Sequence, residues 1–325
     1  MKTKILMCAL PAIILVIFHL AEAQQTKVPR IGILSARSPG PLEIFDAFHQ
    51  GLHNLGYVEG KNINIEYRFA EEKYDRLPAL MADLMSLKPD VILTHTTPGA
   101  LAAKKATTTI PIVIGAAGDI VERGIVASLA RPGGNVTGLT FVTLELDSKR
   151  LELLKEAVPK VIRVGVLVNP ANPAWNNYPQ NMGDLARALR VQLQRVEARD
   201  FEDLEAAFST MRKRNVNALL SVSDTVFGSH RKRIVELAAK HRLPAIGERK
   251  EFSEDGGLIA YGVDIPELFR RAAVYVDRIV KGTKPSDLPI ERPSKFEFVI
   301  NLKTAKQIGV TIPQSVLFRA TKVVK

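Results

Sequence analysis

Polar side chains that could bind a small ligand cluster in the loops that follow the predicted strands. Thr96 and Thr97 stand before Pro98, and Asp224 follows the apolar run 218–222. In open parallel sheets the loops at the carboxyl ends of the strands converge on one edge, so these side chains could meet at one site. The other polar or small candidates from loops of this kind are Ser35, Arg37, His95, Ala117, Asp119, Asn169 and Ser223.

Thr97 followed by Pro98 has the character of a helix N-cap with proline at the first helical position. The start of a helix leaves backbone N–H groups without partners, and these groups suit a carboxylate or another anion. An ordinary helix start would use the same two residues and bind nothing. The sequence therefore leaves two interpretations open, an anion site and a simple cap.

Five further side chains each allow a binding and a structural interpretation. Asp224 either caps the helix that follows it or receives a ligand ammonium group. His95 either donates to a ligand or is structural. Phe141 and Tyr261 end short strands near predicted crossings, where an aromatic ring either stacks on a ligand or packs in the core. Trp175 either lies at the rim of a site or packs its own loop.

The sequence patterns of known enzymes are missing. The chain has no G-x-S-x-G elbow and no H-E-x-x-H helix, and its six histidines lack ligand spacing. The segment 56–62 resembles a phosphate loop superficially, but it lacks one spacer residue and has Asn62 where Ser or Thr is needed. The first strand runs into 35–40 without G-x-G-x-x-G, so a dinucleotide has no cradle. We expect no catalytic residue, no metal and no cofactor.

Short apolar runs alternate with segments of helical period along most of the chain, as in a mostly parallel sheet covered by helices. The predicted strands are 30–34, 62–67, 91–94, 110–114, 138–141, 161–168, 192–196, 218–222, 244–246, 257–261 and 296–301. The predicted helices are 41–55, 74–87, 99–106, 148–157, 179–190, 201–214, 229–241, 266–281 and 303–308. The alternation breaks near Gly138, Gly262 and Pro289. This predicts an α/β fold of two Rossmann-like lobes joined by three crossings, with a ligand cleft between them.

Residues 1–23 have the pattern of a cleaved signal peptide. Two lysines precede the apolar run 5–20, and Ala21-Glu22-Ala23 supplies small residues where a signal peptidase cuts. The run is short for a transmembrane span and contains Pro11. We therefore expect export and a mature chain that begins near Gln24.

Composition narrows the possible functions further. The 325 residues, 46% of them hydrophobic, can form two domains with separate cores. The single cysteine, Cys8, lies in the predicted signal peptide, so the mature chain has neither disulfides nor thiolate chemistry. The formal charge of +11 is spread along the chain without interleaved aromatic residues, and we expect no nucleic-acid partner.

The chain resembles the ABC-transporter substrate-binding proteins of the tryptophan/tyrosine type, which have the type I periplasmic binding protein fold. The most specific segment is SLARPGGNVTG at 128–138. The remaining segments that carry the resemblance are 31–34, 51–62, 97–98, 110–113, 169–170 and 295–301. The chain departs from the family at His95 or Thr96, where relatives often have glycine, and this departure makes the usual ligand less certain.

The resemblance implies a periplasmic protein that captures a small solute, in relatives often an amino acid, and delivers it to a membrane permease. By analogy with the fold, one lobe comprises 25–142 plus 264–290 and the other 143–263 plus 291–325. A zwitterionic ligand would place its carboxylate at the Thr96-Thr97 helix start and its ammonium group at Asp224. A ligand sensor for a membrane kinase and an exported α/β enzyme are the alternative functions.

Overall fold

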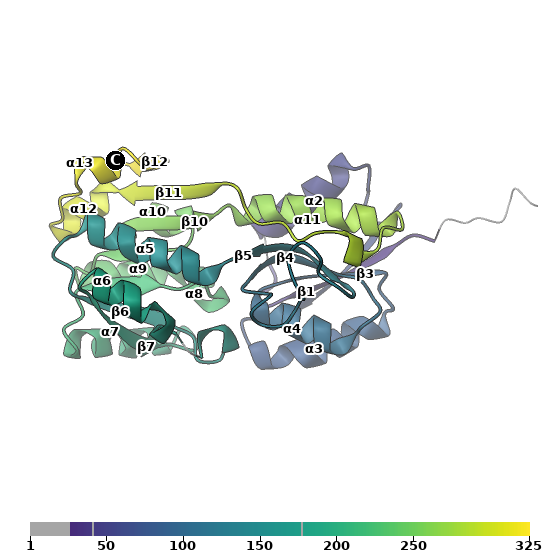
Figure 1. The fold of residues 1–325 in the computed structure, drawn as a ribbon, viewed down its shortest axis with the longest axis horizontal. Helices are drawn as coiled ribbons and strands as arrows, with labels where there is room; N and C mark the ends of the chain where they lie inside the picture. The colour runs from purple at the N-terminus through teal and green to yellow at the C-terminus, as the bar shows by residue number, and fades with distance from the viewer. Residues whose placement is uncertain (1–26, 41, 177) are drawn as a thin grey trace, which may run out of the picture.

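The computed structural model describes residues 27–40, 42–176 and 178–325. The predicted signal peptide lies outside the described residues. The chain forms two lobes side by side, each built on its own sheet with helices on both faces (Figure 1). The predicted two-lobed α/β fold is therefore confirmed.

The first sheet has five parallel strands in the order β2-β1-β3-β4-β5. Residues 31–35 of β1 are all buried, as expected for a strand covered by helices on both faces. Its strands are β1 (Arg30–Ser35), β2 (Asn64–Phe69), β3 (Val91–His95), β4 (Ile112–Gly118) and β5 (Val136–Phe141).

Helices from distant parts of the chain cover the first sheet. α2 (Glu43–Asn54) and α11 (Ile265–Val280) pack together on one face, where Phe48 and Phe269 are buried. α3 (Leu77–Ser86), which follows the 3₁₀ turn η1 (Tyr74–Arg76), and α4 (Thr97–Ala106) cover the other face. The first lobe thus contains α11, which follows most of the second lobe in sequence (Figure 1).

The second sheet has seven strands in the order β12-β11-β10-β9-β8-β6-β7, and β11 runs antiparallel to β10. The strands of this sheet are β6 (Arg163–Val168), β7 (Gln192–Glu197), β8 (Ala218–Ser221), β9 (Ala245–Gly247), β10 (Ile259–Val263), β11 (Phe296–Asn301) and β12 (Lys322–Val324). The last strand, β12, was not predicted from the sequence.

The helices of the second lobe form two groups. α5 (Thr143–Ala157) contacts α13 (Gln314–Leu317) and the 3₁₀ turn η3 (Gln180–Met182), which leads into α6 (Gly183–Ala188). The second group surrounds α9 (Arg231–Lys240). Its members are α7 (Asp203–Lys213), α8 (Thr225–Ser229), α10 (Lys250–Glu254) and α12 (Leu302–Ile308).

Three segments connect the two lobes. The chain passes from β5 directly into α5, from β10 directly into α11, and from the 3₁₀ turn η4 (Pro285–Asp287) along β5 into β11. On this third passage Thr140 N donates to Glu291 O at 3.0 Å. The chain therefore crosses between the two sheets near each predicted break in the alternation.

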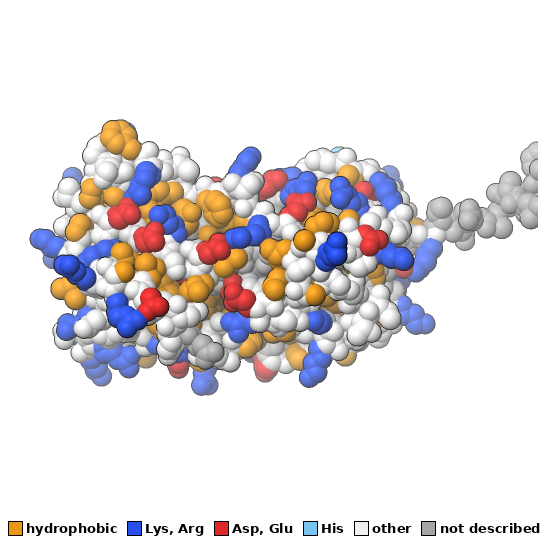
Figure 2. Space-filling model, in the orientation of Figure 1, with side chains coloured by type: hydrophobic (Ala, Val, Ile, Leu, Met, Phe, Trp, Pro, Cys, Tyr) orange, Lys and Arg blue, Asp and Glu red, His pale blue; other side chains and the backbone are white. Residues whose placement is uncertain are grey.

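Some element boundaries differ from those predicted. α5 begins at Thr143 instead of 148. The predicted helix 229–241 corresponds to α9, and the short helix α8 before it was not predicted. Within the described residues, no helix is both long and apolar enough to cross a membrane. Figure 2 shows lysine and arginine side chains distributed over both lobes on one face, with acidic side chains among them.

Candidate functional site

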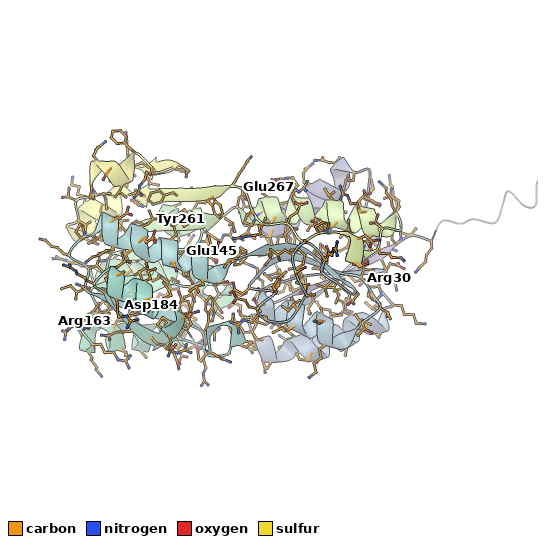
Figure 3. The ribbon with its side chains drawn as sticks, viewed as in Figure 1. Arg30, Glu145, Arg163, Asp184, Tyr261 and Glu267 are labelled. Carbon is orange, nitrogen blue, oxygen red and sulfur yellow. The ribbon has the colours of Figure 1, made fainter. Side chains whose placement is uncertain are left out.

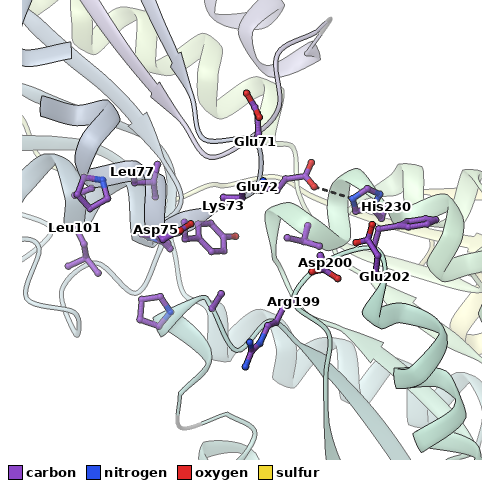
Figure 4. Close-up of a pocket in the computed structure, with 18 of the residues that line it drawn as sticks. Glu71, Glu72, Lys73, Asp75, Leu77, Leu101, Arg199, Asp200, Glu202 and His230 are labelled. Carbon is purple, nitrogen blue, oxygen red and sulfur yellow. Dashed lines mark hydrogen bonds and ion pairs between the residues drawn. The ribbon is translucent and has the colours of Figure 1, made fainter. Parts of the chain in front are cut away.

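Two hollows lie between the lobes, and we name them the inner pocket and the outer groove. The inner pocket is a cavity of about 90 Å³ lined by loops at the carboxyl ends of strands from both sheets. The outer groove is larger, about 760 Å³, and is lined by the segments 71–78 and 98–105 of the first lobe and by 199–202 and His230 of the second (Figure 4). Tyr74 lines both.

The inner pocket brings most of the predicted site residues together. Eight of them line it: Arg37, His95, Thr96, Thr97, Ala117, Phe141, Ser223 and Asp224. Ser35 and Asn169 lie one layer behind, bonded to His95 and Asp224 respectively. Asp119 does not line the pocket either; its carboxylate accepts from the backbone N–H of the lining residue Thr143 at 2.9 Å.

Tyr261 does not line the inner pocket. Its ring stacks on Phe296 at a centroid distance of 6.0 Å and meets Phe298 edge-on. Figure 3 places Tyr261 on β10, within the second lobe. Of the two interpretations that the sequence left open, packing within the lobe is the one that the structure shows.

The start of α4 forms one wall of the pocket. The N-cap is Thr96, one residue before the predicted Thr97, and its Oγ1 accepts from Gly99 N at 3.3 Å. Thr96 N donates to Ala116 O, and Thr97 Oγ1 donates to Gly118 O. No acceptor in the described part of the chain takes the N–H of Thr97, so this donor of the first helical turn can bind a ligand.

The backbone around this wall is strained. Thr96 has φ 65° and Asp119 has φ 55°, in the region that glycine prefers. A Cβ on Gly118 would lie 2.1 Å from Thr143 Oγ1, so the chains approach closely here. Backbone strain of this kind persists at ligand clamps, where surrounding structure holds it.

Asp224 caps α8 and is fully hydrogen-bonded. Oδ1 accepts from Val226 N at 3.0 Å and from Asn169 Nδ2 at 3.2 Å. Oδ2 accepts from Asn172 Nδ2 at 2.8 Å and from Trp175 Nε1 at 3.3 Å. Burial raises the pKa of Asp224, and these four bonds oppose the rise. The cap interpretation is therefore what the structure shows, and Trp175 packs its own loop while it lines the pocket.

His95 is buried and neutral. Burial, together with a smaller contribution from the nearby charge of Arg37, lowers its pKa to about 3. Its Nε2 lies 3.0 Å from Ser35 Oγ, and its ring meets Phe269 edge-on. Ser35 is fully buried, so its hydroxyl is not exposed in the pocket. His95 therefore uses its Nε2 atom within the protein, as the structural interpretation expects.

Sequence reasoning missed several lining residues. Tyr74, Asn172, Thr143, Glu248, Arg249 and Ile265 all line the inner pocket. Glu248 and Arg249 directly follow β9, as Ser223 and Asp224 follow Ser221 at the end of β8. The rule that selected Asp224, a polar residue after a buried strand, would also have selected Glu248.

Two α/β lobes that enclose a small polar pocket define a solute-binding protein of the type I periplasmic binding fold. A model of the family described as ABC transporter substrate binding protein matches residues 31–324. The chain belongs to this family, and the predicted resemblance is confirmed. Proteins of this family bind small-molecule substrates.

Known proteins resemble the chain over most of its length. A tyrosine-binding protein of Clostridioides difficile is 28% identical over 263 residues, which cover 81% of this chain and 75% of that protein. A Streptococcus pneumoniae ABC domain, solved in complex with L-Trp, is 25% identical with a TM-score of 0.80 and covers 90% of this chain and 100% of its own.

Two further structures support the fold. A conserved domain protein of Vibrio cholerae is 29% identical, with a TM-score of 0.82 over 91% of this chain and 100% of its own. A leucine-binding protein of Thermotoga maritima has a TM-score of 0.60 at 13% identity, over 78% of this chain and 84% of its own. The second likeness shows the fold alone.

Proposed function

We propose that this protein captures an amino acid, with an aromatic one as the first candidate, in the inner pocket and delivers it to an ABC permease. The observation that carries this proposal is the pocket between the lobes, whose lining includes polar and charged residues of both. The relatives described as tyrosine-binding and as bound to L-Trp support the choice of ligand class. Binding is the whole activity, because the pocket's histidine is a poor base and its neighbouring hydroxyl is buried.

The ligand carboxylate binds at the start of α4 in this proposal. The N–H of Thr97 points from a helix N-terminus, where the helix dipole also favours negative charge. Asp224 is a weaker candidate for the ammonium group than the sequence suggested, since four N–H donors already occupy its oxygens. An ammonium group there would have to replace one of them.

The lobes comprise 25–142 plus 264–290 and 143–263 plus 291–325, and they rotate about the three crossings. The packing of α11 on α2, and of α5 on β9 and β10, supports this division. Ligand binding should therefore compact the molecule. Small-angle scattering tests this: an unchanged radius of gyration with saturating ligand would count against closure.

The protein is exported and acts in the periplasm, with Gln24 as its first mature residue. The sequence of residues 1–23 supports export, and the family supports a role outside the cytoplasm. Mass spectrometry of the secreted protein should find the chain beginning at or near Gln24. An intact N-terminus, or a lipid on Cys8, would contradict it.

A thermal-shift screen of the twenty amino acids tests the function itself. A ligand at about one hundred times its Kd adds about 2.7 kcal/mol to the free energy of unfolding, which corresponds to a rise of roughly 5 °C in melting temperature. L-tyrosine and L-tryptophan are the first candidates. If no amino acid raises the melting temperature, the proposed function is wrong.

A further inference from the structure

The inner pocket contains four charged side chains, and two of them already have partners within the protein. Asp224 accepts four N–H donors, as described above. Arg249 bonds Glu251, with Nε to Oε2 at 2.9 Å, and lies 3.7 Å from Glu43. Both groups are thus balanced without a ligand.

Arg37 and Glu248 are different. Within the described part of the chain, neither the Arg37 guanidinium nor the Glu248 carboxylate has a hydrogen bond or an ion pair, although both line the pocket. Burial lowers the pKa of Arg37, the charge of Arg249 lowers it further, and the charge of Glu248 opposes the change. The two groups therefore feel each other's charge while their N and O atoms stay more than 4.0 Å apart.

The two residues lie at the carboxyl edges of different sheets, one in each lobe. Arg37 follows β1 of the first sheet, and Glu248 follows β9 of the second. Both lie at the carboxyl edge of a parallel sheet, where ligands bind in folds of this class. Arg37 lines the same pocket as Thr96 and Thr97 at the start of α4.

We propose that Arg37 and Glu248 are the charge pair that recognises the ligand, with the α-carboxylate on Arg37 and the α-ammonium group on Glu248. This inference rests on the proposed function and deepens it. A guanidinium binds a carboxylate through two parallel N–H donors, and a carboxylate accepts from an ammonium group with a charge-assisted bond. A ligand that carries both charges pairs with both side chains at once and so bridges the two lobes.

The arrangement also explains why a zwitterion is selected. Partly buried charges without partners are costly, and a neutral solute would leave both of them uncompensated. A ligand with a carboxylate alone would satisfy Arg37 and place its remaining atoms against an unpaired Glu248. The pocket therefore distinguishes amino acids from simple carboxylic acids at Glu248, whereas Asp224 holds the Trp175 loop.

Calorimetry with three probes tests the assignment. The probes are L-tyrosine, its deaminated analogue 3-(4-hydroxyphenyl)propanoic acid, and its carboxamide L-tyrosinamide. The variants are Glu248→Gln and Arg37→Gln, with Glu254→Gln as control, because Glu254 lies on α10 and pairs with Lys322 outside the pocket. Melting temperatures without ligand establish that each variant is folded.

Glu248→Gln should weaken L-tyrosine binding about 30-fold or more, and the deaminated analogue should bind wild type and variant nearly equally. Arg37→Gln should weaken L-tyrosine by a similar factor and affect L-tyrosinamide little. Glu254→Gln should match wild type with all probes.

Two outcomes would overturn the inference, and they are distinguishable. If wild type binds L-tyrosine but Glu248→Gln or Arg37→Gln binds it as tightly, the charge pair is wrong while the proposed function stands. The same holds if Glu248→Gln weakens L-tyrosine and its deaminated analogue equally, because the carboxylate would then act on folding or closure instead of on the ammonium group. If wild type binds no amino acid, the proposed function fails and the inference fails with it.

Discussion

The inner pocket and the outer groove lie between the same two lobes, but they differ in how particular charged groups are partnered. In the outer groove, the Glu72 carboxylate of the first lobe lies 3.1 Å from His230 Nε2 of the second, so a side-chain hydrogen bond joins the two lobes (Figure 4). In the inner pocket, Arg37 and Glu248 are left without partners in the described part of the chain. The comparison suggests a division of roles: the contact in the outer groove holds the lobes together, and the inner pocket leaves Arg37 and Glu248 to the ligand.

Tyr74 separates the two regions. Its side chain is 8% exposed, and its hydroxyl accepts from Thr225 N of the other lobe at 3.4 Å. The turn before it contains Glu71 and Glu72 with φ of 52° and 67°, so strained backbone places this ring in the cleft. A ligand that leaves the inner pocket through the groove must displace Tyr74.

The largest expected effect concerns the support of the inner pocket. Asp224→Asn places an NH₂ group against donors that now bond a carboxylate, and it should lower the free energy of unfolding by about 3 kcal/mol. Chemical denaturation without ligand measures this loss. Asp184→Asn, at an exposed pair with Arg187, is the control and should change little. If Asp224→Asn is as stable as wild type, the Asp224 carboxylate is not needed to support the pocket.

The next effect is a pH dependence that arises in the inner pocket. The folded-state pKa of His95 is about 3, below its unfolded value of 6.5, so the unfolded state binds a proton first as the pH falls. Stability is complete above pH 6.5 and declines below it by about 1.4 kcal/mol per pH unit, or about 2 kcal/mol at pH 5. Chemical denaturation of wild type and His95→Gln above pH 6.5 and at pH 5 measures this loss of stability. If the two chains lose equal stability, His95 is not the source.

Tyr74→Ala tests whether this ring closes the inner pocket. Removing the ring should accelerate ligand dissociation by about tenfold or more, because barriers to exit act mainly on the off-rate. Tyr74→Phe keeps the ring and loses only a long hydrogen bond, so its off-rate should change less than about threefold. Stopped-flow displacement of the amino acid found in the screen gives both rates. Unchanged rates in Tyr74→Ala would place the exit elsewhere.

The smallest effect is expected for the ion pair of the outer groove. Glu72 and His230 are partly exposed, so the pair is worth about 0.2–1 kcal/mol, and each of Glu72→Gln and His230→Gln should raise the off-rate only about two- to fivefold. The double variant should equal either single one, since one interaction is lost in each. Additive effects would show that the residues act separately.

The fold was accessible from the sequence because its signals are local. Buried strands such as β1 and β8 are continuous apolar runs, and amphipathic helices such as α11 show a clear stripe. The three-residue strand β12 and the five-residue helix α10 were missed because such short segments contain fewer than two periods of a pattern. The start of α5 at Thr143 was missed because Val142, its N-cap, makes no side-chain cap.

Only part of the site could be predicted from the sequence, because several lining residues are brought to the pocket by tertiary structure. The loops after β3 and β8 were found by position. Glu248 also follows a buried strand, but it was passed over because it stands among the charged residues of 247–251. Tyr74 was assigned to a helix, since nothing in Glu71-Glu72 predicts a left-handed backbone at two non-glycine residues. Tyr261 was selected for its place near a crossing, whereas its side chain packs on the neighbouring strand β11.

A crystal structure of the protein with its amino acid tests the central claim most directly. We predict the ligand in the inner pocket, its carboxylate at Arg37 and the start of α4, its ammonium group at Glu248, and the outer groove empty of it. A ligand seated in the outer groove, or one in the inner pocket that leaves both Arg37 and Glu248 without contact, would contradict the account.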